Sequence, residues 1–220
     1  MSLPFTADEF LEVFRMYNLS VWPSQIAFYL LALVAILLLL TPFRYAGRLN
    51  FFALSFFWIW MGAVYHLGFF RQINPAAFMF GVFFIIQGLL FLYFGLNQKL
   101  RVELKRNVYG MTAIILFIYA LIIYPVLSYS FGHIYPYSPT FGLPCPTTIF
   151  TLGILLTTKK SVPLILIIIP MLWSILGFSA ALSLDIFEDT GLIISGVVFL
   201  ILYFLKKRQN RRSIHFHFSE

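Results

Sequence analysis

The run PAAFMFGVFFIIQGLLFLYFGLN, residues 75–97, contains no Asp, Glu, Lys or Arg. It is longer than the roughly 20 apolar residues that an α-helix needs to cross a bilayer. Its glycines, Gly81, Gly88 and Gly95, recur at every seventh residue and form one smooth face that a second helix can approach closely. The run therefore predicts a membrane-spanning helix that packs against a neighbour.

The composition extends this pattern to the whole chain of 220 residues. Hydrophobic residues make up 61% and charged residues only 10%, whereas soluble domains carry about 25% charged residues. The predicted fold is all-α, a polytopic bundle of seven transmembrane helices over residues 22–205, with no room for a soluble domain. The predicted spans are roughly residues 22–41, 49–70, 75–97, 108–131, 143–158, 162–183 and 190–205.

Basic residues are distributed unevenly between the predicted loops. All of the 15 Lys and Arg residues except Arg15 and Arg71 fall in the first, third and fifth loops or in the tail 206–220. Short cytoplasmic loops collect positive charge, so the N-terminus is predicted outside and the C-terminus in the cytoplasm. The net charge of +7 then indicates topology and a basic cytoplasmic tail, and not nucleic-acid binding.

The N-terminal segment 1–21 has a pattern of its own. Thr6 followed by Glu9 is a capping box, a sequence signature of a helix start. Apolar residues then recur at helical spacing on one side, which predicts a short amphipathic helix at the outer membrane surface. Such a helix acts either as an interfacial anchor, which we favour, or as a lid.

The stretch GHIYPYSPTFGLPCPTT, residues 132–148, interrupts the apolar pattern. From Thr147 onward only about a dozen residues precede Lys159, fewer than a spanning helix needs. We therefore expect residues 139–147 to form a non-helical segment that dips below the outer surface, where its backbone must border protein or water. Cys145 lies there between two prolines. The segment is either the wall of an outward-facing polar cavity or a tight structural cap.

Polar residues near the predicted outer helix ends are candidates for lining that cavity. His66 is costly in a membrane helix unless it faces protein or water, so it is either a hydrogen-bonded core residue or a ligand. Gln87 lies in mid-span and needs a partner, either on another helix or along a polar path. Of the acids before the last helix, Asp185 is placed nearest the cavity, whereas Glu188 and Asp189 are interpreted as solvated charges or helix-dipole partners. The candidates for cavity lining or ligand binding are His66, Arg71, Gln87, Tyr124, His133, Tyr135, Cys145, Thr147 and Asp185.

Three motifs together resemble those of a known family: WMGAVYH at 60–66, INPAAF at 73–78 and PTFGLPCPTTIF at 139–150. The family comprises bacterial integral membrane proteins of unknown function, and the resemblance extends over nearly the whole chain. It implies a multi-pass protein of the bacterial inner (cytoplasmic) membrane. It implies no activity and no functional residues.

Three function classes are compatible with these patterns. We favour a small-solute or ion transporter, because irregular backbone within the membrane and a mid-span amide are typical of such proteins. A membrane-embedded enzyme is the alternative, with or without zinc or another transition metal bound by His66, His133, Cys145 and Asp185. No cofactor is evident, and a ligand-binding sensor is the third class. The expected partners are the lipid bilayer, a small solute or ion and further copies of the chain in a homo-oligomer; nucleic acid is not expected.

Overall fold

The structure is a computed structural model that describes residues 4–97 and 100–217, with side chains up to residue 210. The described part is all-α, as predicted, with π-helical turns at η1 and η3 and 3₁₀ turns at η2 and η4. Its elements are α1 Ala7–Val21, α2 Ser24–Leu40, α3 Ala46–Trp60, η1 Met61–Phe69, η2 Phe70–Gln72, α4 Ala77–Asn97, α5 Val108–Ile118, η3 Tyr119–Ile123, α6 Tyr124–Ser130, α7 Pro144–Leu156, α8 Ile165–Ser183, η4 Phe187–Asp189 and α9 Thr190–His217.

The long helices have the length and composition of membrane spans. Five stretches could cross a membrane, and α1 and α2, which meet at a bend of 85°, would together make a sixth, broken span. α7 is apolar but shorter than a bilayer crossing requires. In the described part of the chain, these apolar helices indicate a multi-pass membrane protein with five or six long spans. The five stretches are Ala46–Gln72, Ala77–Asn97, Val108–Ser130, Ile165–Ser183 and Phe187–Asn210.

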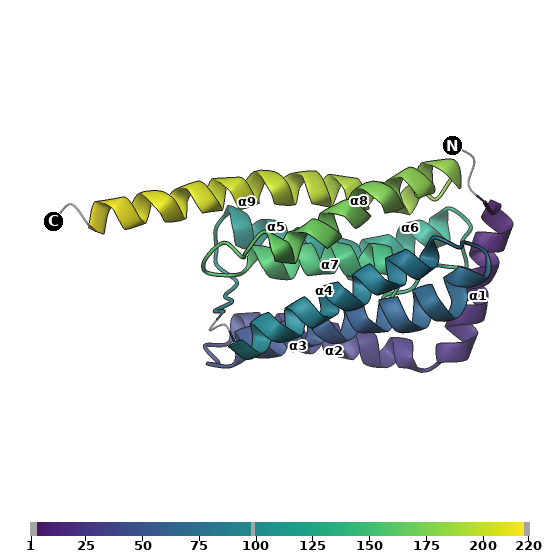
Figure 1. Cartoon of the computed structure of the whole chain (residues 1–220), viewed down its shortest axis with the longest axis horizontal. Helices are drawn as coiled ribbons and strands as arrows, with labels where there is room; N and C mark the ends of the chain where they lie inside the picture. Colours follow the sequence, from purple (N-terminus) through teal and green to yellow (C-terminus); the bar gives the residue numbers. More distant parts are fainter. Residues whose placement is uncertain (1–3, 98–99, 218–220) are drawn as a thin grey trace.

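Most helices run along one axis, and α1 crosses them (Figure 1). α1 stands across one end of the bundle, whereas the last turns of α9 extend beyond the opposite end. α7 is the central helix, because it contacts α3, α5, α8 and α9. All of its residues except Cys145 are buried. A short helix is thus enclosed by its neighbours in the centre of the bundle.

The glycine stripe of α4 brings two helices into backbone contact. A Cβ atom at Gly81 would lie 3.1 Å from the carbonyl oxygen of Gly62, and one at Gly88 would lie 2.9 Å from that of Ser55. Larger side chains would force α4 away from α3 and η1. The close approach predicted from the seven-residue glycine spacing is therefore confirmed.

Two spans contain π-helical turns at the end of the bundle near α1. η3 directly precedes Tyr124 and Pro125, and Pro125 lacks the N–H that a carbonyl in the preceding turn would accept from. η1 contacts α1 and carries Tyr65 and His66. π-helical turns are frequent at functional sites, so this end of the bundle is a candidate location for one.

The expectation that residues 139–147 are non-helical is wrong for its second half. α7 begins at Pro144, so only residues 139–143 lie outside the helices. Proline is well suited to a first helical turn, where its missing N–H has no partner to lose. Gly142, at φ +102°, makes the turn into the helix. Its N–H donates a hydrogen bond to Oγ1 of Thr147 at 3.0 Å, which ties the turn to α7.

Candidate functional site

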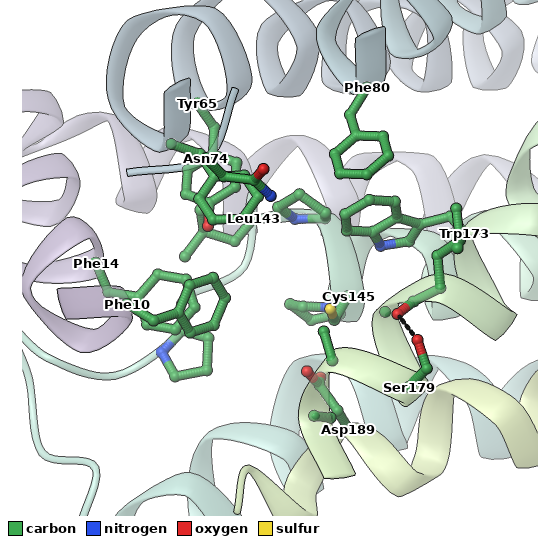
Figure 2. A pocket seen from close by; sticks show the side chains of 18 of the residues that line it. Phe10, Phe14, Tyr65, Asn74, Phe80, Leu143, Cys145, Trp173, Ser179 and Asp189 are labelled. Atoms are coloured by element: carbon green, nitrogen blue, oxygen red, sulfur yellow. Dashed lines mark hydrogen bonds between the residues drawn. The ribbon is translucent and has the colours of Figure 1, made fainter. Parts of the chain in front are cut away.

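A cavity of about 170 Å³ lies at the end of the bundle that α1 covers. Side chains converge on it from α1, η1, α8, η4 and the start of α7 (Figure 2). The sequence predicted a polar cavity, but its wall is mainly aromatic and apolar. The lining residues are Phe5, Phe10, Phe14, Tyr65, Phe70, Asn74, Phe80, Tyr124, Pro139, Leu143, Pro144, Cys145, Pro146, Trp173, Leu176, Gly177, Ser179, Ala180, Ala181 and Asp189.

α1 closes one side of this cavity. Phe10 and Phe14 line it, and the ring of Phe14 packs 6.2 Å from that of Tyr65 on η1. The capping box predicted at Thr6 and Glu9 is present at the helix start. The apolar face of α1 therefore contacts the protein. α1 thus covers this side of the cavity, a position compatible with both sequence interpretations, the interfacial anchor and the lid.

Asn18 ties α1 to the segment that leads into α7. Its side-chain amide donates hydrogen bonds to the carbonyl oxygens of Pro136 at 2.7 Å and Ser138 at 2.8 Å. Its Oδ1 accepts one from the Thr140 hydroxyl at 2.8 Å. Asn18 is fully buried, so no water competes for these bonds. Any movement of α1 away from this segment would have to break all three.

Asp189 supplies the only carboxylate that the described residues bring to the cavity wall. The Tyr124 hydroxyl donates a hydrogen bond to its Oδ1 at 2.5 Å, and Cys145 lines the same cavity. The preceding residue, Glu188, is fully buried, and its Oε1 lies 2.8 Å from Nδ1 of His133. The cavity wall therefore carries one buried acid together with a phenol and a thiol, whereas the adjacent buried acid pairs with an imidazole and does not line the cavity.

The sequence interpretation of these acids is wrong. Asp185 is exposed, has a left-handed backbone with φ 58°, and does not line the cavity. Glu188 and Asp189 are instead 0% and 5% exposed, because η4 turns them inward against α6 and η3. All three acids occur in one short polar segment. The only feature of the sequence that distinguishes Glu188 and Asp189 from Asp185 is that they directly precede the last apolar helix.

His66 lies beside the cavity and not in its wall. Its ring is fully buried, 4.6 Å from the ring of Phe84 and 5.2 Å from that of Trp173, which does line the cavity. Within the described chain neither ring nitrogen has a hydrogen-bond partner. His66 is thus a core residue enclosed by aromatic rings, without the hydrogen bond that the sequence interpretation expected of a core histidine.

The other candidates have mainly structural positions. Gln87 is fully buried and donates to the carbonyl oxygen of Leu166 on α8 at 3.0 Å, which confirms the predicted bond between helices. Thr147 is buried at the start of α7. Tyr135 is exposed, with its hydroxyl 3.5 Å from the backbone oxygen of Asn18. Arg71 is exposed and does not line the cavity.

The four predicted metal ligands do not converge. Among the residues that the structure describes, no three His, Cys, Asp or Glu side chains are placed to hold a metal ion. His66 is enclosed by aromatic rings, His133 contacts Glu188, and Asp185 is exposed. Only Cys145 of the four lines the cavity. This donor set does not fit zinc, which takes several ligands in a tetrahedral arrangement.

The long apolar helices identify the class, a multi-pass α-helical membrane protein. The chain belongs to the family of unknown function DUF6064, which matches residues 7–214. No curated protein and no solved structure matches it. The family resemblance carried by the three motifs is therefore confirmed.

Proposed function

We propose that the protein binds a small organic cation in the cavity under α1 and carries it across the membrane. One observation supports this above all. The described residues bring one carboxylate, that of Asp189, to a largely aromatic wall, and bring no Lys, Arg or His to it. Such a wall favours a ligand with a positive charge or hydrogen-bond donors. It disfavours an anion, because the Asp189 carboxylate would repel the anion and no basic side chain in the wall would offset that repulsion.

The cavity volume sets the size of the ligand. About 170 Å³ is close to the roughly 150 Å³ of an engineered apolar cavity that takes up benzene. Gly177 also lines this space, and a Cβ atom there would lie 2.8 Å from Cδ2 of Leu192, so a larger residue would displace that neighbour. The ligand is thus about one aromatic ring in size and carries a cationic group.

The aromatic wall adds to the attraction for a cation. The faces of Phe, Tyr and Trp rings attract positive charge, most strongly where water is excluded. Figure 2 shows Phe10, Phe14 and Trp173 around the space above Asp189. The carboxylate would pair with the charged group, and the rings would cover the rest of the molecule.

The arrangement of the helices supports transport as the purpose of binding. α7 is a short enclosed helix that starts at the cavity, and residues 139–143 before it are non-helical. Interrupted helices and irregular backbone beside a cavity are typical of transporters. We propose seven crossings, with α2 and α7 included, and an external N-terminus as the basic loops predict. The proposed location is the bacterial inner membrane.

A series of ligands of similar shape tests the charge preference. The purified protein is titrated with benzylguanidinium, benzyl alcohol and benzoate, and its Tm is measured. Benzylguanidinium should raise the Tm most, and Asp189→Asn should remove that preference. Asp185→Asn changes an exposed acid four residues away and should leave it intact. Equal stabilisation by benzoate would contradict the proposal.

Uptake into proteoliposomes tests transport separately from binding. Benzylguanidinium stays charged at neutral pH, so it crosses protein-free lipid slowly. Radiolabelled benzylguanidinium should enter vesicles that contain the wild-type protein faster than vesicles that contain Asp189→Asn. Binding without uptake would contradict the transport half of the proposal and leave a cation-binding protein.

A thiol beside a carboxylate supports an enzyme as the second candidate. Cys145 and Asp189 both line the cavity, and a carboxylate can act as the base that accepts the proton of a cysteine nucleophile. Incubation with p-nitrophenyl acetate would then acetylate Cys145, which mass spectrometry detects. An adduct that Asp189→Asn loses and Asp185→Asn keeps would favour the enzyme, and absence of the adduct would count against it.

A further inference from the structure

A second cavity, of about 160 Å³, lies between the end of α7, the start of α5 and α9. These elements meet at the end of the bundle opposite α1 (Figure 1). Among the described residues, its wall carries three lysines, Lys105, Lys159 and Lys206, and one acid, Glu103. The wall is therefore net positive, in contrast to that of the cavity under α1.

Lys206 is a cation buried without an acidic partner. It is 8% exposed, and its ammonium donates to the carbonyl oxygens of Leu156, at 2.9 Å, and Thr158. The ring of Tyr109 lies 5.2 Å from its Nζ. None of the ion pairs formed by described residues includes Lys206. Burial of a charge is costly unless it is paired, so an anion in this cavity would supply the missing compensation.

The surrounding charges leave room for such an anion. Glu103 pairs with Lys159 at 2.8 Å and lies 4.0 Å from Lys105, so one carboxylate serves two lysines. Asn107 and Gly110, at the first turn of α5, also line the cavity. The N-terminal end of a helix carries partial positive charge, which adds to that of the lysines.

The backbone around the cavity is held in place. The N–H of Glu103 donates to the oxygen of Thr157 at 3.0 Å, and that of Lys159 donates to the oxygen of Arg101 at 2.8 Å. These bonds join the segment before α5 to the end of α7. Binding would therefore require little ordering of the backbone, and its ordering cost would fall mainly on the half-exposed side chains of Lys105 and Lys159.

We propose that this cavity binds a phosphate group, held by Lys206, Lys105 and Lys159 at the start of α5. A phosphate offers several strong acceptor oxygens, which match lysine donors that converge from three segments. Two sources share this chemistry, free inorganic phosphate and the headgroup of an anionic lipid such as phosphatidylglycerol. The inference is independent of the proposed cation transport, since it concerns the opposite end of the bundle.

Binding is tested on the full chain purified in a phosphate-free glycoside detergent. Inorganic phosphate and dihexanoyl phosphatidylglycerol are added separately, with sodium chloride at equal ionic strength as the control, and Tm and affinity are measured. A Tm rise with inorganic phosphate identifies free phosphate as a ligand. A rise with the lipid alone identifies the headgroup. No rise above that with sodium chloride from either probe overturns the proposal.

Each lysine has a neighbouring basic residue that does not line the cavity, which provides matched controls. Lys206→Gln, Lys105→Gln and Lys159→Gln should each weaken binding about tenfold, the effect of losing one charge-assisted hydrogen bond. Lys207→Gln, Arg106→Gln and Lys160→Gln should change it less than about twofold. Lys206 also supports the end of α7, so Lys206→Gln could unfold the protein. In that case Lys105→Gln and Lys159→Gln provide the test. Equal losses of phosphate affinity in the three cavity-lysine variants and in the three control variants would overturn the proposal.

Discussion

The hydroxyl of Tyr124 donates a hydrogen bond to the carboxylate of Asp189, although the two residues are 65 positions apart in the sequence. Tyr124 begins α6 and Asp189 ends η4, so this bond joins two elements across the cavity wall. Both side chains are almost fully buried. A buried hydrogen bond of this kind orients the carboxylate before any ligand arrives, which is what a binding site for a cation requires.

Tyr124→Phe should destabilise the fold and weaken cation binding, because it leaves the Asp189 carboxylate without its phenol donor. The expected loss in the free energy of unfolding is about 2 kcal/mol. Tyr119→Phe is the control, since Tyr119 donates to the backbone oxygen of Glu188 at 2.8 Å and should cost about 1 kcal/mol without lowering affinity. Thermal unfolding and benzylguanidinium titration measure both. Unchanged affinity in Tyr124→Phe would contradict a role in orienting the acid.

Asn18→Ala should release the lid. It removes the bonds to Pro136, Ser138 and Thr140, so the opening free energy of α1 should fall by roughly 2 kcal/mol. Hydrogen exchange of the α1 amides should accelerate, and benzylguanidinium should associate faster. Ser20→Ala, on the exposed side of the same helix, should change neither. Faster association without faster exchange would argue against a lid.

His66→Phe should retain or raise stability. The imidazole is buried among aromatic rings and neither nitrogen is hydrogen-bonded within the described chain, so its replacement removes unpaired polar atoms. Gln87→Leu, by contrast, leaves the Leu166 oxygen without its donor and should cost about 1 kcal/mol. Unfolding in detergent compares the two. A large loss of stability in His66→Phe would show that the imidazole has a polar role.

The sequence predicted those features that depend on local pattern. Apolar length indicated the spanning helices, the spacing of Thr6 and Glu9 indicated the start of α1, and glycine spacing indicated the contact between α4 and α3. Each of these follows from a rule that acts within a few turns of chain.

The cavity depends on contacts that no local pattern encodes. Asp185 and Asp189 occur in the same polar segment, and the second is held inward by contacts from distant elements such as the Tyr124 phenol of α6. The apolar face of α1 predicts burial, but it does not distinguish a lipid surface from a protein surface. Trp173 is one of many aromatic residues in apolar runs, so the sequence does not single it out as a cavity residue. The candidate site was therefore only partly predictable, through Tyr124 and Cys145.

Acid should weaken the contact between Glu103 and Lys159. The hydrogen bond from Lys159 lowers the pKa of Glu103, and the nearby lysine charges act in the same direction. A carboxylate with a lowered pKa in the folded state stabilises the fold above its unfolded value of about 4.3, and this contribution is lost as pH falls through the folded pKa. The difference in Tm between wild type and Glu103→Gln should thus be present near neutral pH and shrink in acid. A difference that grows in acid would contradict this assignment.

The basic loops predict that the cavity under α1 opens toward the outside, and cysteine labelling can test this orientation. Cys145 is the only native cysteine, so Cys145→Ser provides the background. Ser130→Cys reports on the end of α6 near α1, and Lys160→Cys reports on the loop after α7; both positions are exposed. A maleimide that cannot cross membranes should label the first in intact cells and the second only after permeabilisation, because short loops rich in Lys and Arg stay in the cytoplasm. The opposite pattern would reverse the orientation, and the proposed cation would then enter its cavity from the cytoplasm.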